Sequence, residues 1–345
     1  MQEQLVGHME DDSDNFYFMI NPYFPTAEMF KELADNLPHL IRYYASNQKV
    51  ISEKIKKLEG IDLPLIAVNG SCEAIRVFLQ NYTKKSLVTV PNFNEWEITE
   101  HVPIAYNAST NEVREAIRRE EVDTVCFCNP NNPTGFYRGD IQELAEEFPN
   151  VRFVIDISFI DFVDEKIPEF PKGKNVVLVK SLGKNYGICG IRLGYIASED
   201  EELIRGMVPK FPIWNVNSVA EFLISQIMRH KEEYERSRVK IIEGTRKMVS
   251  LLKEFPDMEV FPTKANFIMV KTDRKFNFNV KSCSNKTGLV GNHYRFAYNK
   301  NYEKLREWLN DGLNNGLNNR LNNRLNNGLN NGLNDKKEKD DGSSN

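Results

Sequence analysis

Two kinds of apolar pattern alternate along the chain as far as about residue 200. Short runs rich in β-branched residues are apolar at nearly every position, and between them lie segments such as EAIRVFLQNY and DIQELAEEF, whose apolar residues recur at helical spacing. Near-continuous apolar strands that alternate with helices are typical of a mostly parallel sheet covered on both faces. We therefore expect an α/β fold with a three-layer α/β/α domain, whose strands are residues 64–68, 86–90, 123–128, 151–156, 175–181 and 193–198.

The pattern changes beyond Glu201, where long helical segments dominate. Residues 218–255 have helical periodicity, and the runs NFIMVK and YRFAY are strand candidates that follow them. This part indicates a second, smaller α/β domain, which the N-terminal segment joins. The expected division is an N-terminal segment at 1–42, a large domain at 43–205, a small domain at 206–310 and a tail at 311–345.

The tail consists of LNNG and LNNR units in which leucine returns at every fourth position from Leu309 to Leu333. A period of four drifts against the 3.6 residues of a helical turn, so the leucines would spiral around a helix and form no single stripe. Glycine and asparagine weaken a helix further. The composition predicts a disordered, low-complexity tail, with a binding element as the alternative.

Composition narrows the class of protein. The 345 residues are 41% hydrophobic and carry a net charge of −4, which allows a large core and provides no basic patch for nucleic acid. No apolar run is long enough to span a membrane, and the polar, acidic first residues do not resemble a signal peptide. Neither the five scattered cysteines nor the five histidines have the spacing of metal ligands. We expect a cytoplasmic protein with free thiols and without a metal, a nucleic-acid partner or a membrane span.

Several unusual polar residues share one position, the carboxyl end of an expected strand. They lie in NGSCE at 69–73, PNFNEW at 91–96 and NPNNPTG at 129–135, at Asp156, and in SLGK at 181–184. Ligands of open α/β sheets bind at that edge. Five consecutive strand ends with such residues indicate one large polar ligand.

The residue types at these strand ends match the needs of one cofactor. Gly70 and Ser71 begin a predicted helix, whose free amide groups and dipole favour a phosphate, although Ser71 is equally a plain N-cap. Lys184 follows a buried strand, where an unpaired ammonium is costly and a lysine for covalent chemistry is expected. Asp156 can keep a pyridine nitrogen protonated. A lysine together with such an acid is the usual protein contribution to pyridoxal-phosphate chemistry.

The strings NPNNPTG and SLGKNYGICGIRLGY resemble the two signatures of fold-type I pyridoxal-phosphate enzymes, in the class I/II aminotransferase family. The resemblance covers roughly residues 18–309 and is greatest to the branch with histidinol-phosphate aminotransferase and threonine-phosphate decarboxylase. It implies the cofactor pyridoxal 5′-phosphate, a homodimer, Lys184 as the catalytic Schiff-base lysine, and Asp156 at the pyridine nitrogen.

The same resemblance assigns the other cofactor contacts. Asn132 would donate a hydrogen bond to the phenolic oxygen of the ring, and Phe93, in preference to Trp96, would stack on the ring. The remaining residues would all bind the cofactor phosphate, and they are Gly70, Ser71, Cys72, Ser181 and Arg192.

Four residues are assigned to the substrate and to the second subunit. Arg295 falls where the family binds the substrate carboxylate, with an ion pair between domains as the alternative, and Asn21 lies in the segment at the entrance of the site. Tyr43, with Tyr44 as the other candidate, matches a tyrosine that reaches the cofactor phosphate of the neighbouring subunit.

The cofactor motifs leave the reaction open, because the orientation of the substrate decides which bond at its Cα breaks. Most of the family transfers amino groups, so an aminotransferase for a small phosphorylated amino compound is the first hypothesis. Phe159, where the aminotransferases usually have tyrosine, and the string CSNKTGL resemble the phosphoamino-acid decarboxylases, which are the alternative.

Two further departures concern the phosphate site and the small domain. Gly183 replaces the usual Ser or Thr before the lysine, which should cost a minor phosphate contact. Only TDRKFNFN stands where the family has a helix between NFIMVK and VKSCSNK, so an apolar face of the small domain is exposed or covered by other residues. A degenerate protein that binds the cofactor with little catalysis is the third hypothesis.

Overall fold

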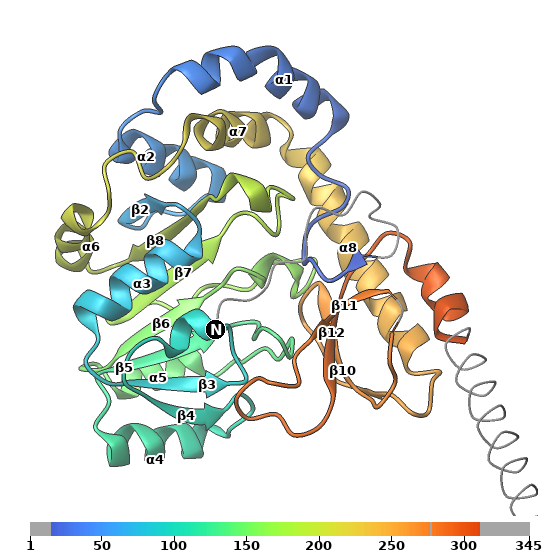
Figure 1. Cartoon of the computed structure of the whole chain (residues 1–345). Helices are drawn as coiled ribbons and strands as arrows, with labels where there is room; N and C mark the ends of the chain where they lie inside the picture. Colours follow the sequence, from blue (N-terminus) through green and yellow to red (C-terminus); the bar gives the residue numbers. More distant parts are fainter. Residues whose placement is uncertain (1–14, 277, 311–345) are drawn as a thin grey trace, which may run out of the picture.

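The computed structural model describes residues 15–276 and 278–310, which form two β-sheets and the helices around them (Figure 1). The predicted tail at 311–345 and the start of the N-terminal segment lie outside the described residues. The larger sheet has the order β2-β8-β7-β6-β5-β3-β4, with bounds Leu65–Val68, Gly194–Ser198, Val176–Ser181, Arg152–Asp156, Thr124–Cys128, Ser86–Val90 and His101–Ala105. The smaller sheet has the order β1-β11-β12-β10-β9, with bounds Asn15–Phe16, Asn279–Ser282, His293–Ala297, Phe267–Lys271 and Glu259–Val260.

The helices come from segments with the expected periodicity. The α-helices α1 to α8 are Ala27–Arg42, Gln48–Glu59, Ser71–Tyr82, Thr110–Glu120, Ile141–Glu147, Glu201–Met207, Ser218–Arg229 and Lys231–Leu252, and residues 305–310 are also helical. The short 3-10 helices η1 to η5 are Asn94–Glu97, Ile160–Phe162, Cys189–Ile191, Val208–Lys210 and Tyr302–Lys304. The single helical segment expected at 218–255 is two helices that meet at His230.

The larger sheet confirms the predicted α/β class. Its strands are parallel to one another except β8, which is antiparallel to both β2 and β7. The six expected strands are present, each within one residue of its predicted bounds. The edge strand β4 was not expected, because its sequence HVPIA contains a proline and its side chains are only partly buried. The strand can form because a proline is tolerated at the edge of a sheet.

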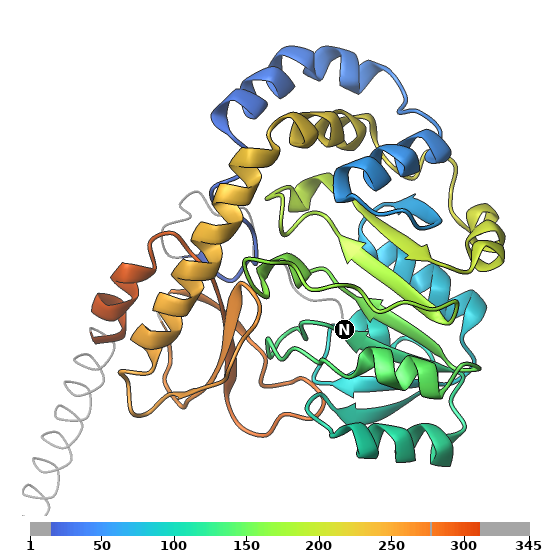
Figure 2. The same ribbon diagram turned by 180° about the vertical axis from the view of Figure 1, so that it is seen from behind.

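Helices cover both faces of the larger sheet (Figures 1 and 2). Alternate residues of a strand point to opposite faces, so Val177 and Val179 of β7 pack against α3 and α6, while Val176 and Leu178 pack on the other face with α4 and α5. On that second face, a further cluster joins β2 and β8 to α2, α7 and Met29 of α1.

This packing differs from the expected division of the chain. Residues 1–42 and 206–310 were assigned to the small domain, but α7 joins the apolar cluster on the larger sheet and α1 packs on α7. The reason is that the apolar side of α7, with Leu223 and Ile224, continues the cluster formed by Ala67 and Tyr195 of the larger sheet. The smaller sheet packs instead against the second half of α8, through Met248, Leu252 and neighbouring residues.

The shortened part of the small domain leaves no bare apolar face around Phe296, which is fully buried. Phe276 and Phe278, from the loop that stands in place of the family's helix, lie with their ring centroids 5.2 and 6.2 Å from that of Phe296. Trp308 packs on Phe16 and Phe278 from the far side. Aromatic side chains of the loop thus replace the packing of a helix.

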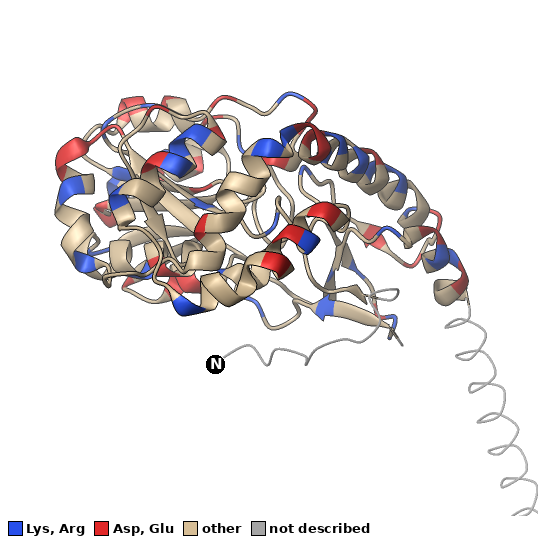
Figure 3. Cartoon of the chain, turned by 90° about the horizontal axis from the view of Figure 1, so that it is seen from above, with Lys and Arg blue, Asp and Glu red and all other residues tan. Residues whose placement is uncertain are grey.

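Two surface properties follow from the fold. Among the described residues, no helix is long and apolar enough to cross a membrane. Acidic and basic residues are interspersed on the helices seen from above (Figure 3).

Candidate active site

The predicted site residues follow strands that end at one edge of the larger sheet. Because β2, β7, β6, β5 and β3 run parallel, the chain leaves each of them on the same side. Asp156 is the last residue of β6 and lies beside Cys128, the last residue of β5. Ser181 is the last residue of β7. The structure therefore brings the strand ends together as the sequence led us to expect.

Lys184 is half-buried in the irregular segment after β7. Its Nζ lies 3.2 Å from Ser181 Oγ, and its backbone carbonyl accepts a hydrogen bond from the Asn21 amide at 3.0 Å. Gly187 allows the N-terminal segment to pack closely, since a Cβ there would lie 1.9 Å from the carbonyl oxygen of Phe24. The N-terminal segment therefore fixes the backbone of the lysine.

Asp156 is 6% exposed, and its carboxylate makes two contacts with neighbouring residues. Oδ1 accepts the Ser158 amide at 2.9 Å, and Oδ2 lies 3.7 Å from the Cys128 thiol. Burial raises the pKa of this carboxyl, while the hydrogen bonds from Ser158 and the nearby Lys184 ammonium act to lower it. A buried carboxylate of this kind is suited to hold a protonated pyridine nitrogen.

Arg192 approaches the start of α3 and forms with it a cradle of possible phosphate donors. Gly70 has φ 75° and ψ 163°, and a Cβ on it would lie 2.5 Å from Nη2 of Arg192. Arg192 itself has φ 62° and donates to the carbonyl of Cys189 at 3.2 Å. Burial raises the pKa of the Cys72 thiol, and both Arg192 and Lys184 are close enough to oppose that shift. The guanidinium, the open helix terminus and the missing Cβ fit the phosphate of pyridoxal phosphate.

Asn132, which follows β5 of the larger sheet, contacts Arg295 of β12 in the smaller sheet. Arg295 Nη1 donates to Asn132 Oδ1 at 2.8 Å, and its Nη2 donates to the carbonyl of Tyr17 at 3.0 Å. An arginine has no acceptor, so the amide oxygen of Asn132 must face it, and the amide nitrogen is left to donate elsewhere. That nitrogen is the group needed at a phenolic oxygen. Arg295 is 6% exposed, and its contacts include the side-chain oxygen of Asn132 and the backbone carbonyl of Tyr17.

The two aromatic candidates differ in burial. Trp96 is fully buried in the cluster between the sheet and α3, whereas Phe93 is partly buried beside it. A ring that stacks on a cofactor must not be enclosed on all sides by other side chains, so the burial favours Phe93. The string CSNKTGL lies against this loop, because Lys286 Nζ donates to the Asn92 carbonyl at 2.9 Å and to Asn94 Oδ1 at 2.7 Å.

The remaining predicted residues are Asn21, Tyr43 and Tyr44, which lie outside the group of strand ends. Asn21 is 2% exposed, and its side-chain amide donates to Ser237 Oγ and the Asn185 carbonyl, so it braces the Lys184 segment where a substrate contact was expected. Tyr43 is 57% exposed at the end of α1, and Tyr44 stacks on Trp214 at 4.3 Å. Within one chain, neither tyrosine makes a contact with the site residues above among the interactions of the described residues.

Sequence reasoning missed two groups that support the site. Ser158 accepts the backbone amide of Ser181 at 2.8 Å, which ties the end of β7 to the segment after Asp156. Glu59, at the end of α2, binds Lys180 and Tyr186 on either side of Lys184. A serine two residues after the aspartate was a visible signal, but nothing in the sequence connects Glu59 to a segment more than a hundred residues away.

Comparisons with known proteins agree with this geometry. Residues 86–289 match the family model "Aminotransferase class I and II". The chain is 31% identical over 309 residues to the CMP-5′-(3-aminopropyl)phosphonate synthase of Streptomyces rubellomurinus, a match that covers 80% of the chain and 49% of that protein, so it spans about half of that relative's length. It is 28% identical to an L-serine phosphate decarboxylase of Campylobacter jejuni, with 81% and 83% covered.

Solved structures share the fold. The histidinol-phosphate aminotransferase of Clostridium acetobutylicum superimposes with a TM-score of 0.77 at 22% identity, over 87% of this chain and 99% of that one. The family model covers more than half of the chain. The chain belongs to the class I and II aminotransferase family, whose members are enzymes that use pyridoxal 5′-phosphate.

Proposed function

We propose that the enzyme removes the carboxyl group, as carbon dioxide, from a small amino acid that carries a phosphate group. The observation that carries this proposal is Phe159. It is 4% exposed and packs edge-on against Phe267 at 4.9 Å, in an apolar cluster, so the position that usually supplies a tyrosine hydroxyl in the aminotransferases supplies none here. The relative from Campylobacter, matched over most of both chains, is an L-serine phosphate decarboxylase and supports the same choice.

The chain's own residues have separate tasks in this reaction. When bound, pyridoxal phosphate supplies an aldehyde for an amine and a ring that accepts the electron pair of the broken Cα bond. Lys184 Nζ would bind the aldehyde and would deliver a proton to the substrate Cα after the carboxyl group leaves. Asp156 keeps the pyridine nitrogen protonated, and Asn132 donates to the phenolic oxygen. Arg192, Ser181 and the amides of residues 70–72 hold the phosphate.

Transamination is the second candidate, and the position of Arg295 favours it. Arg295 contacts Asn132 and therefore lies on the phenolic-oxygen side of the site. An arginine that holds the substrate carboxylate in place would leave the Cα–H bond as the one to break. Decarboxylation instead requires that the carboxylate be free to leave. In that case Arg295 would bind the substrate's phosphate.

The two reactions are separated by their products. Purified enzyme with pyridoxal phosphate is incubated with L-serine phosphate or L-threonine phosphate, with and without a keto acid. We expect carbon dioxide release without the keto acid, and loss of both release and yellow colour in Lys184→Ala. Conversion of the cofactor to its amine form, with no carbon dioxide, would refute decarboxylation and support transamination. Neither product from a yellow enzyme would support the degenerate binder.

We also propose that the enzyme is a homodimer, because apolar side chains are exposed along α1 and the segment after α6. Ile41, Tyr44 and Ile213 are each at least 75% exposed, and patches of this kind mark interfaces. This arrangement would give Tyr43 a route to the partner subunit's cofactor phosphate. Light scattering should give twice the chain mass, and Ile41→Glu should lower it; a monomeric wild type would contradict the proposal.

A further inference from the structure

A cavity of about 530 Å³ lies on the face of the larger sheet that is turned away from α3. Leu178 and Lys180 of β7 line it, whereas their neighbour Ser181 points to the opposite face, where the cofactor residues lie. The cavity is therefore separated from the candidate active site by the sheet itself. Its volume is within the range of small-molecule sites.

The cavity exists because no regular element covers this part of the sheet. Helix α5 has only seven residues, and the segment between Val163 and Asn175 crosses the face between α5 and α2 without a helix or strand (Figure 2). Phe170 of this segment forms one wall, and Leu58, Leu63, Ile167 and Ile227 add further apolar surface. Most of the wall area can thus pack against an apolar body.

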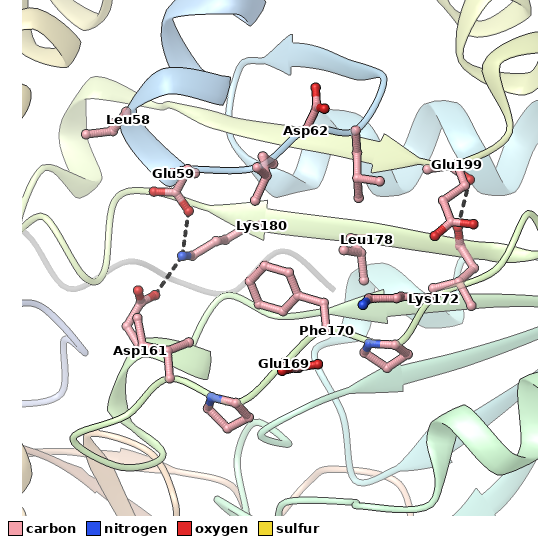
Figure 4. A pocket seen from close by; sticks show the side chains of 18 of the residues that line it. Leu58, Glu59, Asp62, Asp161, Glu169, Phe170, Lys172, Leu178, Lys180 and Glu199 are labelled. Carbon is pink, nitrogen blue, oxygen red and sulfur yellow. Dashed lines mark hydrogen bonds and ion pairs between the residues drawn. The ribbon is translucent and has the colours of Figure 1, made fainter.

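The inner end of the cavity carries a buried group of three charges. Lys180 Nζ lies 2.7 Å from Glu59 Oε2 and 2.8 Å from Asp161 Oδ2, and all three side chains are at most 5% exposed (Figure 4). Two carboxylates face one ammonium, so the group has an excess negative charge if all three are ionised. Arg238 is buried nearby, but it is paired with Glu235 and donates to the Asp161 backbone carbonyl.

The carboxylates of Glu59 and Asp161 differ in their hydrogen bonds. Glu59 also accepts a hydrogen bond from the Tyr186 hydroxyl at 2.8 Å, so both of its oxygens have a contact. Asp161 Oδ2 lies 2.8 Å from Lys180 Nζ but makes no hydrogen bond within the described residues. A buried carboxylate oxygen without a hydrogen-bond donor is costly, and a cationic donor would offset that cost.

The mouth of the cavity carries an excess of negative charge, as its inner end does. Asp62, Glu169 and Glu199 are exposed around it, against Lys172 and Lys231. Carboxylates therefore outnumber lysines at both ends, and anions such as the cofactor or a phosphorylated substrate are disfavoured. We propose that this cavity binds a small organic monocation, an ammonium or amidinium with a compact apolar body, whose charged end pairs with Asp161.

Benzamidine is a suitable probe, because it has this chemistry and benzamide is its neutral counterpart of nearly the same shape. Calorimetric titration of the holoenzyme should show one benzamidine site per chain, with benzamide bound about tenfold more weakly or not at all, since a hydrogen bond to a charged group contributes about 1.5–3 kcal/mol. Benzoate should not bind. The visible absorbance of the cofactor should stay near its value without benzamidine, which distinguishes this site from the active site.

Two variants and one control locate the site. Asp161→Asn should weaken benzamidine binding about tenfold, and Ile167→Trp should fill the cavity and abolish binding while leaving the three charges in place. Asp164→Asn is the matched control, since Asp164 belongs to the same segment but lies outside the cavity and pairs with Arg246 on the surface. A crystal of the complex should show the amidinium beside Asp161.

Three results would overturn the proposal. They are no saturable binding of benzamidine, equal binding of benzamide, and binding unchanged by Ile167→Trp in a folded variant. If Asp161→Asn does not fold, Ile167→Trp and the benzamide comparison still decide the question. Decarboxylase or aminotransferase activity has no part in these measurements, so they stand or fall independently of the proposed function.

Discussion

Replacing Gly70 by alanine should weaken the phosphate cradle in two ways that can be measured separately. The backbone at Gly70, with φ 75° and ψ 163°, lies in a region that is essentially restricted to glycine, and other residues there cost about 1–3 kcal/mol. The added Cβ would also lie 2.5 Å from Arg192 Nη2 and 3.1 Å from its Cζ, so the guanidinium must move.

The second effect acts on the cofactor. A hydrogen bond to a charged group is worth about 1.5–3 kcal/mol, and each 1.4 kcal/mol is a factor of ten in affinity. If Arg192 loses its contact with the phosphate, the Kd for pyridoxal phosphate should rise by roughly 10- to 100-fold. Lys184 and Asp156 stay unchanged, so the absorbance maximum of the cofactor that does bind should stay near that of the wild type.

The assay pairs urea unfolding of the apoenzyme with absorbance titration of pyridoxal phosphate. The unfolding free energy reports the backbone strain, and the titration reports the displaced guanidinium. Gly139→Ala is the control, because Gly139 has no positive φ and no atom lies within 4 Å of its added Cβ. If Gly70→Ala binds pyridoxal phosphate as tightly as Gly139→Ala, Arg192 does not hold the phosphate and the assignment of the cradle fails.

Three further substitutions test the surroundings of the site. Burial raises the folded-state pKa of Asp156, so the folded protein loses stability as the pH rises from the unfolded-state pKa of this carboxyl to its folded-state pKa. Asp156→Asn should therefore stabilise the apoenzyme at neutral pH while weakening catalysis. A lower melting temperature of the variant would contradict this. Lys180→Met leaves Glu59 and Asp161 as two buried carboxylates without their ammonium and should lower the unfolding free energy by about 3 kcal/mol, the lower end for a broken buried pair. A loss below about 1 kcal/mol in urea unfolding would be the opposing result. Arg295→Gln should raise KM for the anionic substrate far more than it lowers kcat. If steady-state kinetics give an unchanged KM, Arg295 does not bind the substrate.

Much of the fold and part of the site follow from local sequence. Strands such as 65–68 are apolar throughout and bounded by turn residues, so their positions could be predicted to within a residue. Asp156 ends one strand, and Asn132 and Lys184 each follow a strand within four residues. Parallel strands end on one edge of the sheet, so these residues could be expected to lie together before any distance was known. Short-range pattern and sheet direction were sufficient for these residues.

The tertiary structure alone decided the contacts between distant segments. Asn21 proved to brace the backbone near Lys184, and Glu59 to hold Lys180, because each side chain is directed by packing that spans more than a hundred residues. The same holds for α7, which joins the larger sheet although it follows that sheet in sequence. Apolar periodicity determines that a helix has a face to bury, but the choice of partner for that face depends on the shape and volume that the whole chain leaves open.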